Sequence, residues 1–419
     1  MMKKNLIFAM LFTFGVVNSN AQAYYICDGF NATPVNISEG LELNPDWNEI
    51  DSITFAEPQF QEVKIVYNGS NATVTIPSNV KGVSCTSGNS SHVVLNSTTA
   101  TDEYLYTVSG TSSNGSLTIN GSYKLTLKLN GVNLTSSKGA AMDIECGKRI
   151  DVIVADGTEN TFVDCANGQQ KAAFYTKGHI EFKGGGNLNI TGKTGHALAA
   201  KEYLVFKASF TGTCNILGAE KDGIHCGKGV KGDGENNYFQ MNGGNLKIAA
   251  CGSDCIDADD YGCAYIKGGN ITLDVTQMDG TGLKVDSIFT MSNGNVTANV
   301  VGNMSEGLRC CYDATFKSGT FKAIVAGNGS RGIRGKKNSK STDTVLNGGN
   351  LNFNGTNVTM TVSGGTYTAE EQKCFGIKAD QKLNQNAGDI SITVTNSAAK
   401  DIKAGTDNWT GGTRNGKTK

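Results

Sequence analysis

One glycine recurs every 25 residues in the middle of this 419-residue chain. The recurring positions are Gly244, Gly269, Gly294 and Gly319. Each glycine precedes a short segment of alternating apolar and polar residues, for example Asn245-Leu-Lys-Ile and Asn270-Ile-Thr-Leu. A fixed period of this length is typical of a solenoid, in which each unit buries its apolar side only by stacking on the next unit. We therefore predict a coil of stacked repeats.

The segments within each repeat have the pattern of strands. Apolar residues alternate at period two and are separated by Gly and Asn, whereas helical repeats need a helical period. Proline usage agrees, because the last of the four prolines is Pro77. Strands that pair with the turns above and below use every backbone N–H, which proline lacks. The sequence thus predicts an all-β fold, a parallel β-helix solenoid of about ten rungs.

The N-terminal residues have the features of a secretory signal. In residues 1–23, Lys3 and Lys4 precede an apolar run, and Ala21-Gln-Ala23 forms a small-residue cleavage site. The run is too short for a membrane span and no other segment approaches the required length. We expect an exported protein that is periplasmic, cell-surface or extracellular. A formal net charge of -1 gives no support to nucleic-acid binding.

Four further regions follow the signal. We predict a linker or irregular cap at 24–60, a β-rich cap with the first rungs at 61–134, the parallel β-helix at 135–406 and a flexible tail at 407–419. The assignment of rungs between 336 and 370 stays open. Among the twelve cysteines, Cys251, Cys255 and Cys263 lie in one rung and are the better disulfide candidates.

A row of basic residues is predicted on the outside of the coil. Apolar markers of successive rungs include Leu283, Leu308 and Ile333, and the residue after each marker should point outward. These outward residues are His225, Asp257, Lys284, Arg309, Arg334, Lys378 and Lys403. Like charges about 4.8 Å apart repel by about 0.9 kcal/mol even in water. The row therefore suggests an anionic ligand, although solvated side chains without a ligand are the simpler alternative.

Acidic residues gather beside this row. They are Asp254, Asp257, Asp259 and Asp260 in one rung and Asp286 in the next, with Asp222 and Glu306 at the matching position of other rungs. Carboxylates that converge from adjacent rungs suit Ca²⁺, which takes six to eight oxygen ligands. The alternative is that these carboxylates only bond backbone amides in turns.

Several motifs resemble those of the bacterial carbohydrate-binding β-helix proteins. They are the stretches that begin at Tyr106 and Leu125, Lys221-Asp-Gly-Ile, Asp254-Cys-Ile-Asp-Ala-Asp and the repeated Gly-Gly-Asn turns. The resemblance implies a right-handed, pectate-lyase-like β-helix that binds acidic or cellulosic plant polysaccharide and carries calcium. Such proteins have an acidic residue where this chain has His196-Ala-Leu-Ala-Ala-Lys201, so a metal site in that rung is not expected.

Three functions remain open at this point. The first is calcium-assisted binding of acidic, uronate-containing polysaccharide. Its predicted ligand-binding residues are Lys284, Arg309, Arg334, Lys378, Lys403, Tyr261 and Tyr312. The second is a pectate-type lyase in which Lys284 or Arg309 removes a proton, because basic neighbours would lower the pKa of a lysine. The third is a structural or adhesin-like surface protein.

Overall fold

The computed structural model describes residues 23–28, 31–36, 52–54, 61–227, 237–258, 261–337, 348–369 and 372–419. Two compact units, Met1–Glu62 and Val63–Lys419, make up the chain. In the first unit β1 (Ala23–Asp28), β2 (Asn31–Asn36) and β3 (Ser52–Thr54) form an antiparallel sheet in the order β2-β1-β3. The linker or irregular cap predicted at 24–60 therefore contains regular strands. Residues 1–22, which hold most of the predicted signal, lie outside the described part.

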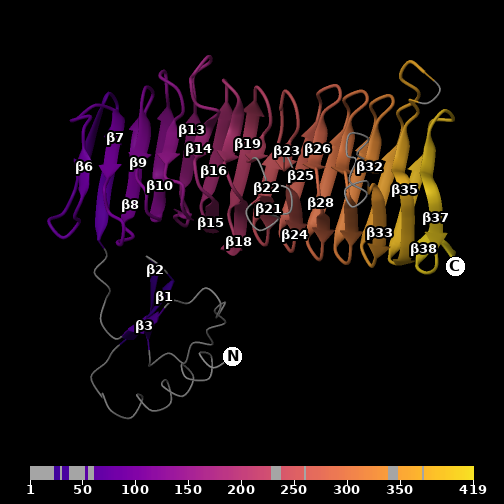
Figure 1. Cartoon of the computed structure of the whole chain (residues 1–419), viewed down its shortest axis with the longest axis horizontal. Helices are drawn as coiled ribbons and strands as arrows, with labels where there is room; N and C mark the ends of the chain where they lie inside the picture. The colour runs from indigo at the N-terminus through magenta and orange to yellow at the C-terminus, as the bar shows by residue number, and fades with distance from the viewer. Residues whose placement is uncertain are drawn as a thin grey trace, which may run out of the picture. The chain divides into compact units, whose positions relative to one another are not determined.

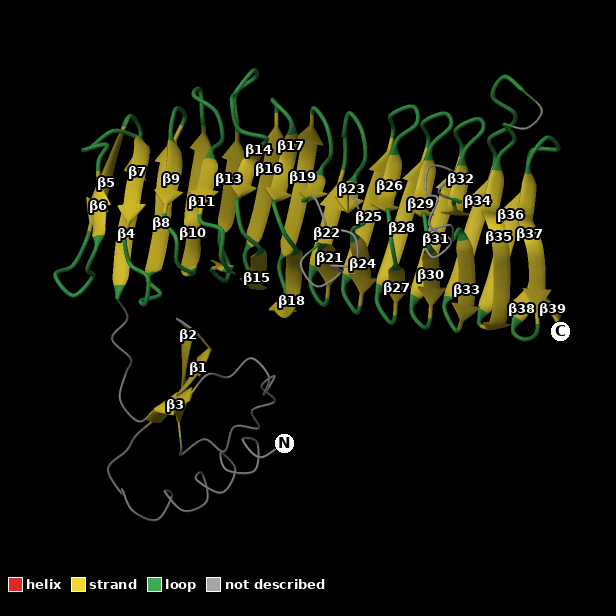
Figure 2. Ribbon diagram, viewed as in Figure 1, coloured by secondary structure: helices red, strands yellow, loops and turns green. Residues whose placement is uncertain are grey.

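The second unit is a parallel β-helix, and its turns stack in chain order (Figure 1, Figure 2). No α-helix occurs among the described residues, and none of them forms a helix long and apolar enough to cross a bilayer. The all-β solenoid predicted from the repeat is thus confirmed. Three ladders of parallel strands run along the coil.

The first ladder carries the polar residues discussed below. It consists of β7 (His92–Ser97), β9 (Ser116–Asn120), β11 (Met142–Glu145), β14 (Ala172–Thr176), β17 (His196–Ala200), β20 (Ile224–Cys226), β23 (Ile256–Ala258), β26 (Thr281–Val285), β29 (Glu306–Cys310), β32 (Arg331–Gly335) and the first parts of β35 (Phe375–Ala387) and β37 (Lys400–Trp409).

The second ladder follows the first around the coil. It comprises the first parts of β8 (Leu105–Ser112) and β10 (Leu125–Thr135), then β12 (Ile150–Val154), β15 (Ile180–Gly184), β18 (Leu204–Phe210), β21 (Tyr238–Met241), β24 (Cys263–Ile266), β27 (Phe289–Met291), β30 (Asp313–Phe316), β33 (Asn350–Asn354) and the ends of β35 and β37.

The third ladder contains the segments that follow the repeating glycines. It comprises the ends of β8 and β10, then β13 (Glu159–Val163), β16 (Asn187–Gly192), β19 (Thr213–Ala219), β22 (Asn245–Ile248), β25 (Asn270–Val275), β28 (Asn295–Val300), β31 (Thr320–Val325), β34 (Asn357–Val362), β36 (Asp389–Val394) and β38 (Thr413–Arg414). The rungs between 336 and 370 were left open by the sequence. In the described part of that region, β33 belongs to the second ladder and β34 to the third.

Antiparallel pairs lie at both ends of the coil. At the N-terminal end β4 (Glu62–Asn68) pairs with β5 (Asn71–Thr75), and β6 (Val83–Cys85) pairs with β7. At the other end β38 pairs with β39 (Lys417–Thr418). Residues 407–419 thus contain the end of β37 and the hairpin of β38 and β39, where Arg414 joins Asp407 at 2.7 Å and lies over the ring of Trp409.

The apolar markers stack in one column inside the coil. Ile256, Leu283, Leu308 and Ile333 are direct partners in register, and each is at most 1% exposed. Burying one such side chain contributes about 1.5–3 kcal/mol. All twelve cysteines are thiols without a disulfide, which overturns the expectation for the cluster around Cys255.

The repeating glycines are required by the backbone of the turns. Gly244, Gly269, Gly294 and Gly319 all have positive φ, between 71° and 90°. In this left-handed region a side chain is strained, so glycine is favoured. The following asparagines form a ladder of their own, because each donates an amide hydrogen to the one before at 2.9 Å. The turn repeat thus explains the 25-residue period.

Candidate functional site

The outward row predicted from the sequence lies in register on the first ladder. Its members pair in the order His225, Asp257, Lys284, Arg309, Arg334, Lys378 and Lys403. We call these seven residues the outer row. The sequence therefore predicted the register of this row correctly, but Asp257, at 5% exposed, is buried rather than outward-facing.

A second polar row lies beside the outer row, two residues before each apolar marker. Its members are His196, Asp222, Asp254, Thr281, Glu306 and Arg331, which we call the inner row. All six are at most 8% exposed. A glycine follows several of them; a Cβ on Gly307, for example, would lie 2.5 Å from the carbonyl oxygen of Gly332. The absence of a side chain there lets the strands pack closely beneath the inner row.

Ion pairs join the two rows. The ammonium of Lys284 lies 2.8 Å from Asp257 and 3.6 Å from Asp254. Glu306 lies 2.9 Å from Arg334, 3.5 Å from Arg309 and 3.7 Å from Arg331. The expected repulsion along the basic row is thus offset within the protein. The sequence did not predict these ion pairs, because they depend on how the inner row and the outer row are aligned.

The environment of Lys284 does not suit the general base considered for a lyase. Burial would lower the pKa of Lys284, but the adjacent carboxylates of Asp257 and Asp254 raise it well above its ordinary value. Burial also acts to lower the pKa of Arg309, but the negative charge of Glu306 has the larger effect and raises this pKa. The prediction that basic neighbours would lower the lysine pKa was wrong in sign. Both groups hold their protons at neutral pH.

Three carboxylates converge at the acidic end of the rows. Ligand oxygens of Asp222, Asp254 and Asp257 all lie within 4.8 Å of one another. Burial raises the pKa of Asp257 to about 7 despite Lys284, and raises that of Asp254. Asp257 Oδ1 is buried and has no hydrogen-bond partner among the described residues. The structure thus brings two of the predicted metal ligands together with Asp222.

Among the described residues, the remaining predicted metal ligand, Asp286, is not part of this group. Asp259 and Asp260 lie outside the described residues. Asp286 instead accepts a long hydrogen bond, 3.8 Å, from the thiol of Cys311.

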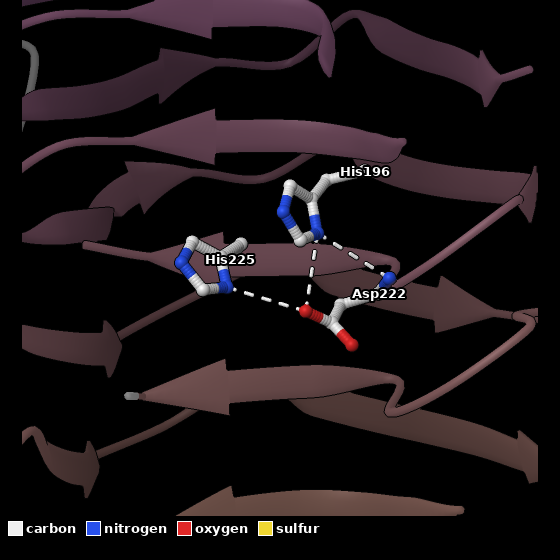
Figure 3. Close-up of side chains that lie close together, drawn as sticks. All are labelled: His196, Asp222 and His225. Carbon is white, nitrogen blue, oxygen red and sulfur yellow. Dashed lines mark hydrogen bonds and ion pairs between the residues drawn. The ribbon is translucent and has the colours of Figure 1, made fainter. Parts of the chain in front are cut away.

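Two histidines adjoin the acidic end. Nδ1 of His196 and Nδ1 of His225 lie 3.1 Å and 3.2 Å from the same oxygen, Oδ2 of Asp222 (Figure 3). The two imidazole rings stack with centroids 4.3 Å apart. Burial lowers the pKa of His196, and the histidine contacts outweigh burial to hold the pKa of Asp222 well below its usual value. A metal site in the rung of His196 was not expected from the sequence, because that rung lacks the acidic residue found in the similar proteins.

The basic end of the outer row contains Lys378 and Lys403. Their ammonium groups lie 5.7 Å and 5.8 Å from the ring centroid of Phe375. Lys403 is exposed, whereas burial and the neighbouring arginines lower the pKa of Lys378. Arg334 also contacts Asp380 at 3.3 Å. The outer row is therefore acidic toward one end of the coil and basic toward the other.

Tyr261 and Tyr312, which were predicted to bind ligand, are both accessible, and their role in binding stays a prediction. Tyr261 is 39% exposed in a turn with positive φ, and Tyr312 is half-buried. The sequence missed a stack of half-buried rings in which Tyr238 lies 4.7 Å from Tyr203 and 5.7 Å from Tyr265. These rings come from neighbouring turns of the second ladder, and only the strand register brings them together.

A surface hollow lies near the last turns of the second ladder. It has a volume of about 650 Å³, and its lining includes Asn352, Asn384, Asn408 and Trp409. The three asparagines bond in sequence at 2.7 Å and 2.8 Å. Trp409, the last residue of β37, therefore lines a hollow at the end of the coil.

A family model described as carbohydrate-binding domain-containing protein matches residues 91–413. This chain belongs to that family. A carbohydrate-binding domain-containing protein of Acetivibrio thermocellus is 27% identical over 110 residues, which cover 24% of this chain and 38% of that relative. The solved polysaccharide lyase-like protein from C. thermocellum, a gadolinium derivative, is 20% identical with a TM-score of 0.32, covering 83% of this chain and 96% of that one. The match thus spans well under half of the curated relative.

Proposed function

We propose that this protein binds acidic polysaccharide along the two polar rows, with calcium at Asp222, Asp254 and Asp257. Membership of a carbohydrate-binding family supports a polysaccharide ligand. The observation that carries the calcium proposal is the buried Oδ1 of Asp257, which has no hydrogen-bond partner among the described residues and lies among three converging carboxylates. We further propose that the protein acts after export, as the signal predicted at residues 1–23 suggests.

The carboxylate group suits a hard cation. Calcium binds oxygen ligands, and these three side chains offer oxygens only. Lys284 already neutralises part of their charge, at 2.8 Å from Asp257. Burial, together with the charges of Asp222 and Asp254, raises the pKa of Asp257 to about 7 even beside Lys284. A divalent cation would supply positive charge at this group. Oxygens of the bound polysaccharide would complete the coordination of the cation.

The basic end would bind carboxylates of the polymer. Lys403 is exposed, and Lys378 stands next to it in register. Ammonium groups pair well with carboxylates, and contacts at a charged surface steer an oppositely charged ligand. Lys284, Arg309 and Arg334 are engaged by protein carboxylates, so we assign them to holding the rows in place rather than to direct contact with the polymer.

A lyase function finds less support. A general base must lose its proton near the working pH. The pKa of Lys284 is raised by Asp257 and Asp254 instead. We therefore favour binding without catalysis.

Co-sedimentation with polygalacturonate tests the proposal. We expect the protein to sediment with the polymer in calcium and to stay in solution with a chelator. Asp257→Asn should weaken retention at least about tenfold, equivalent to about 1.4 kcal/mol. Asp274→Asn is the matched control, because Asp274 lies on the third ladder and contacts Asn299.

Each alternative has its own signature in the same experiment. Retention that ignores both the chelator and Asp257→Asn would overturn the calcium proposal. Absence of retention would favour a structural or adhesin-like role. Ultraviolet absorbance from unsaturated uronate would establish a lyase. Lys403→Gln should also weaken retention, whereas Lys322→Gln on the third ladder should not.

A further inference from the structure

Three side chains from two successive turns converge on one point at the end of the polar rows. His196 begins β17, while Asp222 precedes β20 and His225 lies within it. Figure 3 shows both imidazoles directed at the carboxylate of Asp222. Their three ligand atoms lie within 4.8 Å of one another. The donor set is two imidazole nitrogens and one carboxylate oxygen.

The spacing of these atoms matches that around a small metal ion. Zinc lies about 2.0–2.1 Å from imidazole nitrogen and carboxylate oxygen. Two ligands at such distances, separated by a tetrahedral or octahedral angle, are about 2.8–3.4 Å apart. The contacts from Asp222 Oδ2 to the two Nδ1 atoms are 3.1 Å and 3.2 Å. One ion could therefore contact all three side chains with little rearrangement.

The hydrogen bonding of His196 also favours a cation. Its Nδ1 accepts the backbone N–H of Asp222 at 3.3 Å. The same nitrogen lies 3.1 Å from Oδ2 of Asp222, in the contact described above. A metal ion bound to both atoms would replace this direct contact between them. Metal coordination needs an unprotonated imidazole nitrogen of this kind.

We infer that His196, Asp222 and His225 form a site for a divalent transition metal such as Zn²⁺. Imidazole nitrogens suit zinc, copper, iron and nickel, whereas calcium prefers oxygen ligands. The site is thus distinct in chemistry from the proposed calcium group, although both use Asp222. Three protein ligands leave a further coordination position, and the side chain of His225 is 21% exposed. The ion would join two successive turns of the coil.

Zinc binding to untagged, metal-free protein tests this inference. Titration calorimetry with zinc chloride should show one site in the wild type. His196→Gln and His225→Gln should each weaken that site at least about a hundredfold. His179→Gln is the matched control, because His179 contacts a single carboxylate, that of Glu202 at 2.7 Å. The inference fails if either site variant binds zinc as tightly as the wild type.

A second measurement needs no variant. Cobalt(II) added to the wild-type protein should give visible absorption bands of nitrogen- and oxygen-coordinated cobalt, and zinc should displace them. Absence of such bands would overturn the inference. Asp257→Asn separates the two proposals, because it should abolish calcium-dependent polymer retention and leave zinc binding within about threefold of wild type. Loss of zinc affinity in Asp257→Asn would contradict a separate site.

Discussion

Glu306 is the residue whose replacement should most disturb the polar rows. Its side chain is buried, 3% exposed, and contacts the guanidinium groups of Arg334, Arg309 and Arg331. Glu306→Gln keeps the shape and removes the charge. Arg334 retains Asp380 at 3.3 Å. Arg331, which is 5% exposed, loses the only carboxylate that forms an ion pair with it in the described part of the chain.

The expected cost follows from these contacts. At an effective dielectric constant of about 20, each contact is worth about 5 kcal/mol before desolvation. Desolvation cancels much of this gain, and removing one partner of a buried pair typically costs about 3–5 kcal/mol. We expect Glu306→Gln to lower the unfolding free energy by that amount. Because each turn of a solenoid contacts only its neighbours, the loss should be concentrated in β29 and β32.

Hydrogen exchange gives the clearest measurement of this effect. The amides of Glu306 and Arg331 bond to the preceding turn at 3.0 Å and 2.9 Å. Their exchange should accelerate by about two to four orders of magnitude. Glu145→Gln is the control, since Glu145 pairs with exposed Lys177 at 3.5 Å and should change stability by about 0–1 kcal/mol. Equal, small effects in both variants would refute the view that the buried network is energetically significant.

Three other changes have separate physical causes. Burial raises the pKa of Asp143 to about 6. The carboxyl of Asp143 therefore makes the unfolding free energy fall as pH rises from about 4 to about 6. Asp143→Asn should remove this pH dependence in urea titrations. It should also stabilise the protein above pH 6 by up to about 3 kcal/mol. Gly307→Ala should lower the melting temperature, costing about 1–3 kcal/mol, because its Cβ would lie 2.5 Å from a carbonyl oxygen; Gly147→Ala, with open space around it, should have little effect. Trp409→Ala should weaken retention on neutral glycans if the asparagine-lined hollow binds sugar, and unchanged retention would exclude that role.

The sequence predicted the coil well because the coil is a local repeat. The spacing of Gly269 and Gly294 fixes the turn geometry, and the markers Leu283 and Leu308 fix the strand register. Together they placed the outer row in correct order. The repeat also located Asp254 and Asp257 near each other. These features need only the period and the alternation of side chains.

The electrostatics of the site needed the structure. Whether Lys284 faces a ligand or a protein carboxylate depends on rotamers and on the inner row, which no period reveals. His196 and His225 are separated by 28 other residues, with a looser spacing than the later repeats. Their approach to Asp222 depends on how β17 and β20 pair. The sequence could therefore list the charged residues of this face but not their partners.

The pairing of the two rows changes how the face should bind a polymer. A bare row of cations would attract any polyanion, and its affinity would fall steeply with salt. Here Glu306, Asp254 and Asp257 neutralise the central cations inside the protein. Under the proposed function, selectivity would come from the two ends, where the proposed calcium and the lysine pair of Lys378 and Lys403 differ in chemistry. Because the ends are unlike, a bound chain would meet different groups in its two possible directions, and one direction should be preferred.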